Sequence, residues 1–353
     1  MVNLKAKLPS AWIRGLKRQV TTTGLEASAA LARAGMLAGA RGRGSIFTLH
    51  HVRPKQSLAF QPSGHLEVTP EFLADAIERL SADGYAFVPL DEVPERLANP
   101  TGQPFAAFTL DDGYRNNAEH ALPVFEKYGV PFTVFVARGF AERTHSMWWE
   151  TMADLIGRER ELSFDFGNGP ERIELGCEEQ KFDAFDRFAD LVFRDDEASA
   201  VSRMDALVRC HGIDPLQMTA DLTMDPAELR ELSRHKLATL GAHTISHRAV
   251  GRLSEAQARA EMSSSADYVE ELTGIRPTTI AYPYGTRKAV GERDYRIARD
   301  LGFSVAVTTQ PGTICEKWLT RLTGLPRISL NGHYQRARYV SALASGIPFK
   351  LAR

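Results

Sequence analysis

Short apolar runs alternate with amphipathic segments along most of this chain, from residue 44 onward. The apolar runs predict buried strands covered on both faces, and segments with apolar residues three or four apart predict helices. We predict strands over 45–49, 86–90, 105–110, 131–136, 237–241, 278–281 and 303–307. We predict helices over 70–80, 118–128, 254–272 and 293–301. Such alternation is typical of an α/β fold with a parallel sheet or a barrel.

One long interruption, about residues 147–234, breaks this alternation. It contains L-S-F-D-F-G-N-G-P-E-R-I-E-L, residues 162–175, in which two alternating segments flank a Gly-Asn-Gly-Pro turn and predict a hairpin. The charged stretch 180–209 is expected to be helical. Because the hairpin is short and the helices are amphipathic, we expect an insertion on one face of the fold, without a large core of its own.

Composition adds little to this picture. The chain has 353 residues, of which 43% are hydrophobic and 25% charged, as in ordinary soluble globular proteins. Its three isolated cysteines indicate neither a disulfide framework nor a cysteine-ligated zinc site. A formal net charge of −1 gives no indication of a nucleic-acid partner, and none is expected.

The first 45 residues differ from the rest in charge. They hold eight Lys and Arg residues and the single acid Glu26, a net of +7, which leaves about −8 for the remaining chain. Arg33 interrupts the Ala/Leu-rich stretch 27–40, so no secretory signal is recognised, and no run is long enough to span a bilayer. A solvated helical extension is one interpretation, and an interfacial helix on an anionic membrane is the other. We expect a cytoplasmic chain, free or peripheral at the membrane through residues 1–45.

Two adjacent carboxylates, Asp111 and Asp112, follow the predicted strand 105–110. Successive side chains of a strand point to opposite faces, so both acids can share a cleft only if the chain turns, which Gly113 permits. One aspartate could cap the following helix, but the second would then stay unexplained. Because α/β barrels carry their chemistry at the carboxyl ends of the strands, we expect the active site here.

A second polar cluster, G-A-H-T-I-S-H at residues 241–247, lies at the end of another predicted strand. His243 and His247 are four apart, which would place both rings on one face if a helix begins here. Two imidazoles and one carboxylate form a ligand set that leaves positions open on a zinc-like ion. Such an ion would neutralise one aspartate and hold down the pKa of its neighbour, which would remain a free base. The alternative is a pair of partly buried histidines without a metal.

Three motifs resemble, in their order and strand-end placement, those of the polysaccharide deacetylases, the nodulation-protein-B-type (NodB homology) enzymes of carbohydrate esterase family 4. They are T-L-D-D-G (109–113), H-T-I-S-H (243–247) and Y-P-Y-G (282–285). The resemblance covers about residues 46–330 and implies a distorted (β/α)7-type barrel that removes N-acetyl, or O-acetyl, groups from a glycan. By position it implies that Asp111 is the catalytic base. The implied metal ligands are Asp112, His243 and His247, with Zn²⁺ as first choice and Co²⁺, Ni²⁺ or Mn²⁺ as alternatives.

The third motif departs from the family pattern. Ala281 stands where much of the family has an arginine that orients the base. Arg327, in L-P-R-I-S-L, is the expected substitute, and Arg287 is the second choice.

The family's late L-x-H motif, which supplies the general acid, is also absent, and His333 does not match it. The first predicted strand instead ends F-T-L-H-H-V, which is similar to the Y-H-x-V start of the poly-N-acetylglucosamine deacetylase branch. This similarity implies that His50 is the general acid and His51 its variable neighbour. A histidine satisfied within the core is the alternative for His50.

The remaining expectations concern substrate contacts and boundaries. Candidate substrate-binding residues are Tyr282, Pro283, Tyr284, Trp148 and Trp149, whose aromatic rings could stack on sugar faces. For Trp148 and Trp149, packing in the core is the alternative. The backbone amide of Tyr284, with the metal, would stabilise the oxyanion. We expect an N-terminal extension over 1–45, a deacetylase domain over 46–335 and a tail over 336–353.

Three other functions stay open on the sequence. A hydrolase of another non-peptide C–N bond, such as a cyclic amide, would keep the same Asp and His set. A glycan-binding relative with a defective site would rest on Ala281. A scaffold recruited to the membrane would rest on the basic N-terminal segment.

Overall fold

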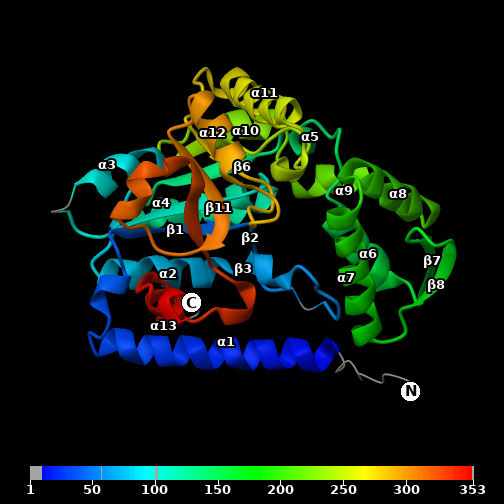
Figure 1. Cartoon of the computed structure of the whole chain (residues 1–353), viewed down its shortest axis with the longest axis horizontal. Coiled ribbons are helices and arrows are strands. Elements are labelled where there is room, and N and C mark those ends of the chain that lie inside the picture. The colour runs from blue at the N-terminus through cyan, green and yellow to red at the C-terminus, as the bar shows by residue number, and fades with distance from the viewer. Residues whose placement is uncertain (1–9, 57, 100–101, 352–353) are drawn as a thin grey trace.

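A computed structural model describes residues 10–56, 58–99 and 102–351 (Figure 1). Lys5 and Lys7 of the basic N-terminal segment therefore lie outside the described residues. Seven parallel strands form a closed ring, because β1 pairs with β12 on one side and with β5 on the other. In ring order they are β1 (Gly44–Leu49), β12 (Leu325–Ser329), β11 (Val305–Pro311), β10 (Thr279–Ala281), β9 (Ala238–Ala242), β6 (Phe132–Val136) and β5 (Phe105–Leu110). The predicted (β/α)7-type barrel is confirmed.

The closing register runs from Gly44 opposite Phe105 to Leu49 opposite Leu110. It brings the carboxyl ends of β1 and β5 to one level, so the residues that follow the two strands are neighbours. Both strands are buried along their whole length, as their continuous apolar sequences predict.

Helices surround the ring, and the four that the sequence predicts are among them (Figure 1). They are α2 (Pro70–Ala82), α3 (Val93–Ala98), α4 (Leu122–Tyr128), α5 (Arg138–Ala141), α10 (Pro226–Ser233), α11 (Glu255–Thr273), α12 (Glu292–Asp300), α13 (Ala337–Ala344) and α14 (Ile347–Leu351). Local signals set several boundaries. The Thr69 side chain accepts a hydrogen bond from Phe72 N at the start of α2. Helix α11 begins with a capping box at Ser254 and ends at Gly274, which adopts the left-handed conformation.

Some elements differ from the predicted ones. The strand predicted over 86–90 is only β4 (Ala86–Phe87), because a 3₁₀ turn begins after Pro89; β4 pairs with the first half of β5, outside the ring. The helix predicted over 118–128 begins with a π-helical turn, Asn117–Ala121, before α4. A short parallel pair, β2 (His51–Val52) and β3 (Glu67–Val68), follows β1.

The insertion forms a lobe beside the carboxyl ends of the strands (Figure 1). Its elements are α6 (Trp148–Arg158), β7 (Glu161–Asp165), β8 (Pro170–Glu174), α7 (Glu178–Arg194), α8 (Glu197–Cys210) and α9 (Pro215–Leu222), with β7 and β8 as the predicted hairpin. The expectation that it lacks a core of its own is wrong, because its helices bury their apolar faces against one another and the hairpin. Tyr114, Ala137 and Phe140 of the barrel belong to the same cluster, so this core continues to the barrel rim.

The N-terminal helix α1 (Ser10–Arg33) lies along one side of the barrel, against α13 and α14 (Figure 1). Leu25 and Ala29 are buried there with Tyr339 and Ala342. The segment expected as a C-terminal tail thus forms the two helices on which α1 packs, as far as Leu351. No helix of the described chain has the length and apolarity needed to cross a bilayer.

Candidate active site

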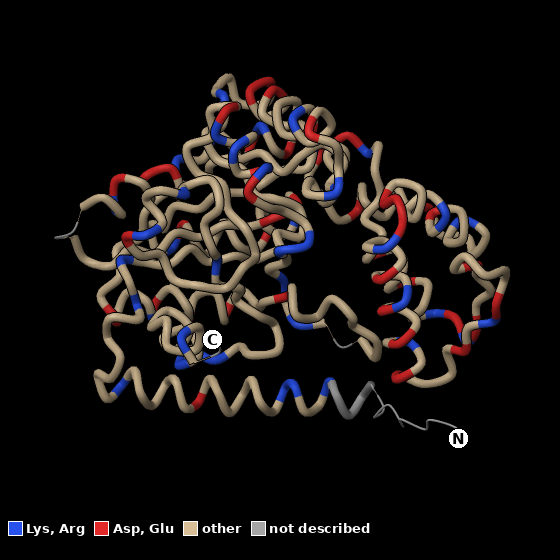
Figure 2. The backbone as a smooth tube through the Cα atoms, in the orientation of Figure 1, with Lys and Arg blue, Asp and Glu red and all other residues tan. Residues whose placement is uncertain are grey.

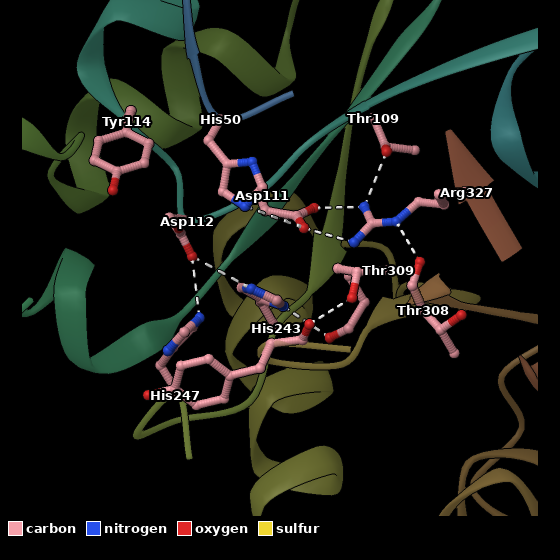
Figure 3. Close-up of polar contacts among 12 residues, drawn as sticks. His50, Thr109, Asp111, Asp112, Tyr114, His243, His247, Thr308, Thr309 and Arg327 are labelled. Atoms are coloured by element: carbon pink, nitrogen blue, oxygen red, sulfur yellow. Dashed lines mark hydrogen bonds and ion pairs between the residues drawn. The ribbon is translucent and has the colours of Figure 1, made fainter. Parts of the chain in front are cut away.

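The two aspartates separate at the end of β5. Asp111 continues the ladder, since its N–H donates to Leu49 O at 3.0 Å. Asp112 and Gly113 then adopt left-handed φ angles of 71° and 67°. The turn therefore begins at Asp112, one residue before the glycine, and it carries both carboxylates to the same end of the barrel (Figure 3).

Arg327 on β12 binds Asp111, which follows β5, past the single intervening strand β1 (Figure 3). Its Nη1 lies 2.7 Å from Oδ1 and its Nη2 2.6 Å from Oδ2 of the carboxylate, a bidentate ion pair. Nε donates to Thr308 O at 2.9 Å, and Nη1 also donates to Thr109 Oγ1 at 3.0 Å. Burial alone would raise the pKa of Asp111, but the Arg327 guanidinium holds that pKa below its ordinary value. The arginine favoured from the sequence thus lies against Asp111, the residue expected to act as the base.

Asp112, His243 and His247 converge beside this pair (Figure 3). Oδ1 of Asp112 lies 3.3 Å from Nε2 of His243 and 3.2 Å from Nε2 of His247. All three side chains are buried. The spacing of the two histidines predicted that they share one face if a helix begins here. No helix begins here, because residues 243–249 form a loop in which Thr244 and His247 have φ angles of 63° and 55°.

The donor set fits a divalent cation. Nδ1 of His243 lies 2.7 Å from Ala281 O, so this nitrogen carries the ring hydrogen and Nε2 presents a lone pair toward Asp112. Oδ1 of Asp112 is buried and has no hydrogen-bond donor. The neighbouring imidazoles nevertheless hold the pKa of Asp112 well below its usual range, against the effect of burial. An anionic oxygen and two imidazole nitrogens, within 4.8 Å of one another, are the ligand type that Zn²⁺ prefers.

Helix α11 holds the histidine loop from behind. One Glu261 oxygen accepts hydrogen bonds from Ile245 N at 2.8 Å and Ser246 N at 2.9 Å, and the other accepts one from Ser246 Oγ at 2.5 Å. Ser265 Oγ accepts from His243 N at 3.1 Å. These contacts stabilise a loop that contains strained left-handed residues. Sequence reasoning missed both residues, since nothing distinguishes them from solvated positions of a helix.

The two histidines after β1 point to different places. The His50 side chain is 16% exposed, and its Nε2 lies 3.9 Å from Oδ2 of Asp111 (Figure 3). Burial lowers the pKa of His50, although the nearby carboxylates oppose this effect. His51 is fully buried instead, with its ring nitrogens 2.8 Å from Asn116 Nδ2 and 3.3 Å from Glu150 Oε1. Of the two, His50 is therefore the one that faces Asp111.

The aromatic candidates divide in the same way. Tyr282 does not reach the site, because it is fully buried and its hydroxyl donates to Thr323 O at 2.8 Å. The prediction that Tyr282 binds substrate is therefore wrong. Pro283 is buried beside it. Tyr284 reaches the rim, where its ring lies 5.1 Å from that of His247.

Trp148 and Trp149 belong to the core of the insertion, so packing is their main role. The indole N–H of Trp148 donates to the Tyr284 hydroxyl at 3.1 Å. That of Trp149 donates to the Tyr114 hydroxyl at 3.1 Å, and the Trp149 ring lies 5.0 Å from His247. The two side chains therefore support the rim of the site from the insertion side and are too buried to offer a sugar a free face.

Two carboxylates of the insertion also reach the barrel. Glu150 accepts a hydrogen bond from the Tyr114 hydroxyl at 3.2 Å. Glu197, at the start of α8, accepts one from the Tyr284 hydroxyl at 2.8 Å and another from Ala249 N at 3.0 Å. Burial raises the pKa of Glu197 above its ordinary value. A cavity of about 460 Å³, lined in part by Glu197, Tyr284 and His247, opens beside this contact.

Comparisons with known proteins agree with this geometry. Residues 98–306 match the model of the polysaccharide deacetylase family, a segment that holds both aspartates and both histidines of the site but neither His50 nor Arg327. YxkH, a candidate polysaccharide deacetylase of Bacillus subtilis (strain 168), is 28% identical over 85 residues, which span 24% of this chain and 29% of YxkH. The alignment thus covers less than a third of that relative.

Two solved structures share the fold. The deacetylase PplD of Streptococcus pyogenes, in complex with acetate, has a TM-score of 0.52 at 17% identity, with 82% of this chain and 92% of that chain covered. IcaB from Ammonifex degensii has a TM-score of 0.54 at 18% identity, with 86% and 98% covered.

Proposed function

Because the chain belongs to the polysaccharide deacetylase family, we propose that it removes N-acetyl groups from a polysaccharide or oligosaccharide with a divalent metal held by Asp112, His243 and His247. One observation carries the proposal: a buried carboxylate without a donor faces two imidazoles, next to a second carboxylate that an arginine holds ionised. We take Zn²⁺ as the first choice because the ligands are two nitrogens and one oxygen.

When bound, the metal would act as a Lewis acid on the acetyl carbonyl and lower the pKa of water. The side chains of the chain would do the proton transfers. Asp111, kept anionic by Arg327, accepts the proton of the attacking water. His50, on the other side of Asp111, donates a proton to the departing sugar amine, a poor leaving group unless protonated.

The pKa directions suit these roles in part. A lowered pKa keeps Asp111 deprotonated and able to act as a base at neutral pH. The lowered pKa of His50 makes it a stronger acid but leaves less of it protonated in the free protein. The nearby carboxylates would favour the imidazolium that donation requires.

The contact of Arg327 with both oxygens of Asp111 weakens the glycan-binding alternative, which rests on Ala281. The alternative of another non-peptide C–N bond keeps the same residues and is separated by product analysis.

The test is a screen of N- and O-acetylated glycans, including chitooligosaccharides, with chelated protein to which Zn²⁺, Co²⁺, Ni²⁺ or Mn²⁺ is added back. We expect acetate release, restored by metal and measured with the mass loss of the glycan. Asp111→Asn protein, loaded with the same metal, is the matched control. Hydrolysis of cyclic amides without acetate release from any glycan would contradict the proposal.

A further inference from the structure

Helix α1 is fixed to the barrel by one face only. Leu25, Ser28 and Ala29 are buried on that face. The carboxylate of Glu26 is turned toward α13, where it accepts hydrogen bonds from Arg338 and from the Tyr339 hydroxyl, the latter at 2.6 Å. Arg338 and Tyr339 lower the pKa of Glu26 to about 2, so this side chain is a paired anion. The only acid of the segment is therefore neutralised on the inner face.

The opposite face of α1 is uncharged and exposed. Its residues, three or four apart along the helix, are Leu16, Val20, Thr23, Ala27 and Ala30, and Ala34 continues the strip directly after the helix ends. Leu16 is 60% exposed and Val20 65%. Met36 and Leu37, just after the helix, are 53% and 48% exposed. We call these eight residues the α1 surface.

Basic side chains border the α1 surface. Lys17 and Arg33 are exposed on α1; Lys17 lies close enough to Asp186 of α7 to interact with it electrostatically, and the described residues include no acidic partner for Arg33. Arg41 likewise has no acidic partner within the described chain; its guanidinium carbon lies 5.7 Å from the centre of the Tyr85 ring. Figure 2 shows α1 as an outer layer of the molecule with Lys and Arg at both of its ends.

A cavity of about 560 Å³ opens at the carboxyl end of α1. Arg33, Arg41, Arg79 and Arg338 line it, and Asp83 is the only acid among its described lining residues. Arg79 is paired with Asp83 at 2.9 Å, and Arg338 is paired with Glu26. The charges of Arg33 and Arg41 thus remain for an external anion, beside the apolar side chains of Met36 and Leu37.

From this juxtaposition we propose that the α1 surface docks on a membrane that contains anionic phospholipid, with lipid phosphate at Arg33 and Arg41 and the apolar side chains in the interface. The combination of an apolar strip, flanking cations and no acid within the strip is the pattern of peripheral helices on acidic lipid. A second copy of the chain is a less suitable partner for the α1 surface, because pairing two such surfaces would bring their flanking basic side chains together.

The proposal is tested with the full chain and vesicles of phosphatidylcholine, alone or with about 30% phosphatidylglycerol. We expect co-sedimentation with the anionic vesicles only, weakened by high salt. Each basic residue near an acidic surface is worth about fivefold in affinity, so Arg33→Glu with Arg41→Glu should weaken binding by roughly 25-fold or more. Leu16→Ser with Val20→Ser should also weaken it, since both side chains are exposed and their loss leaves the fold intact.

The matched control is Ile275→Ser with Arg296→Glu, an exposed apolar and an exposed basic residue outside the α1 surface, which should bind like the parent. Equal binding to both vesicle types, or none to either, would overturn the proposal. So would a dimer in light scattering that Leu16→Ser with Val20→Ser converts to a monomer without any vesicle binding. The readouts do not involve deacetylation, so they are independent of the proposed activity.

Discussion

Asp111 and Asp112 are neighbours in the chain, yet they belong to two differently built halves of the site. In the base half, both oxygens of Asp111 accept hydrogen bonds from Arg327. In the metal half, Oδ1 of Asp112 has no donor and faces two imidazole nitrogens. The first carboxylate is compensated by an arginine of the barrel, whereas the second faces two imidazoles with which, under the proposed function, it shares a cation. Equal burial of two acids therefore does not mean equal chemistry.

The largest effect should come from the metal half. His243→Ala or His247→Ala should lower metal content and reduce turnover by roughly 10⁴-fold or more, because the Lewis acid is lost with its ligand. Metal analysis and acetate release measure this. His211→Ala, which removes a histidine of the insertion paired with Glu159, is the control and should change neither. Full metal content in both ligand variants would mean that the site lies elsewhere.

The second-largest effect on turnover should come from removing the negative charge of Asp111 in the base half. Asp111→Asn should reduce turnover by roughly 10³–10⁴-fold and leave the metal bound, because an amide of nearly the same shape cannot accept the proton of water. Asp112→Asn should lose metal affinity instead. If the first variant lost metal and the second kept it, the roles assigned to the two halves would be reversed.

His50 tests the acid. His50→Ala should fold, bind metal and lose roughly 10²–10⁴ in rate on an N-acetyl glycan, the usual contribution of a positioned acid. The loss should shrink on an activated aryl acetate, whose leaving group needs no proton. His51→Ala should lower the unfolding midpoint, because His51 is buried and bonded to Asn116. Equal losses for His50→Ala on both substrates would indicate a structural role.

Arg327 tests the ion pair. Without its guanidinium, burial should dominate and raise the pKa of Asp111 above its ordinary value. Turnover needs the carboxylate, so in Arg327→Met the acid limb of the pH–rate profile should move to higher pH and the rate at neutral pH should fall by about 10²-fold. Arg287→Met, which removes the exposed second-choice arginine, should leave the profile unchanged.

The same pair links stability to pH. A carboxylate whose folded pKa lies below the unfolded value stabilises the protein above the unfolded pKa, and this stabilisation is lost as pH falls through the folded pKa. Arg327→Met should remove it and cost about 3–5 kcal/mol at neutral pH, because the buried Asp111 loses its counter-charge and must take up a proton to stay buried. Urea unfolding at several pH values measures both effects.

The smallest expected effect tests the support that the insertion gives to the metal half. Glu197→Ala should weaken metal affinity by about tenfold, because Glu197 holds Ala249 N and the tyrosine that packs on His247. Glu197→Gln should restore part of the loss. Asp205→Ala is the matched control, a carboxylate of the same helix bonded to Ser146 and not to the barrel. Equal metal affinity in the two alanine variants would exclude this role for Glu197.

The sequence predicts the ring well because its strands are continuous apolar runs between helices. It does not predict β12, since L-P-R-I-S carries a proline and an arginine that break the apolar pattern. That arginine can be buried inside the barrel because the Asp111 carboxylate pairs with it, a contact between residues 216 positions apart. Long-range compensation of this kind has no local signal.

The sequence predicts site residues that belong to a recognisable motif. It does not predict those whose side-chain direction depends on local backbone conformation. The spacing of His243 and His247 suggests a helix, yet both rings converge through left-handed residues that are not glycine. Tyr282 and Tyr284 look equivalent in Y-P-Y-G, but the first continues a strand into the core and the second turns to the rim. The sequence gives no indication that Glu197 is buried, because an acidic residue of an amphipathic helix is normally expected to face solvent.

The closure of the ring by β1, β5 and β12 has a consequence for synthesis on the ribosome. His50 and Asp111 emerge early, but the counter-charge of Asp111 follows 216 residues later. Until then the growing chain cannot bury this carboxylate without a penalty, so the closing strands have a reason to stay apart. A product released before residue 327 would contain every motif of the matched segment and still lack a folded base. The active site can therefore be completed only after strand β12 has been synthesised.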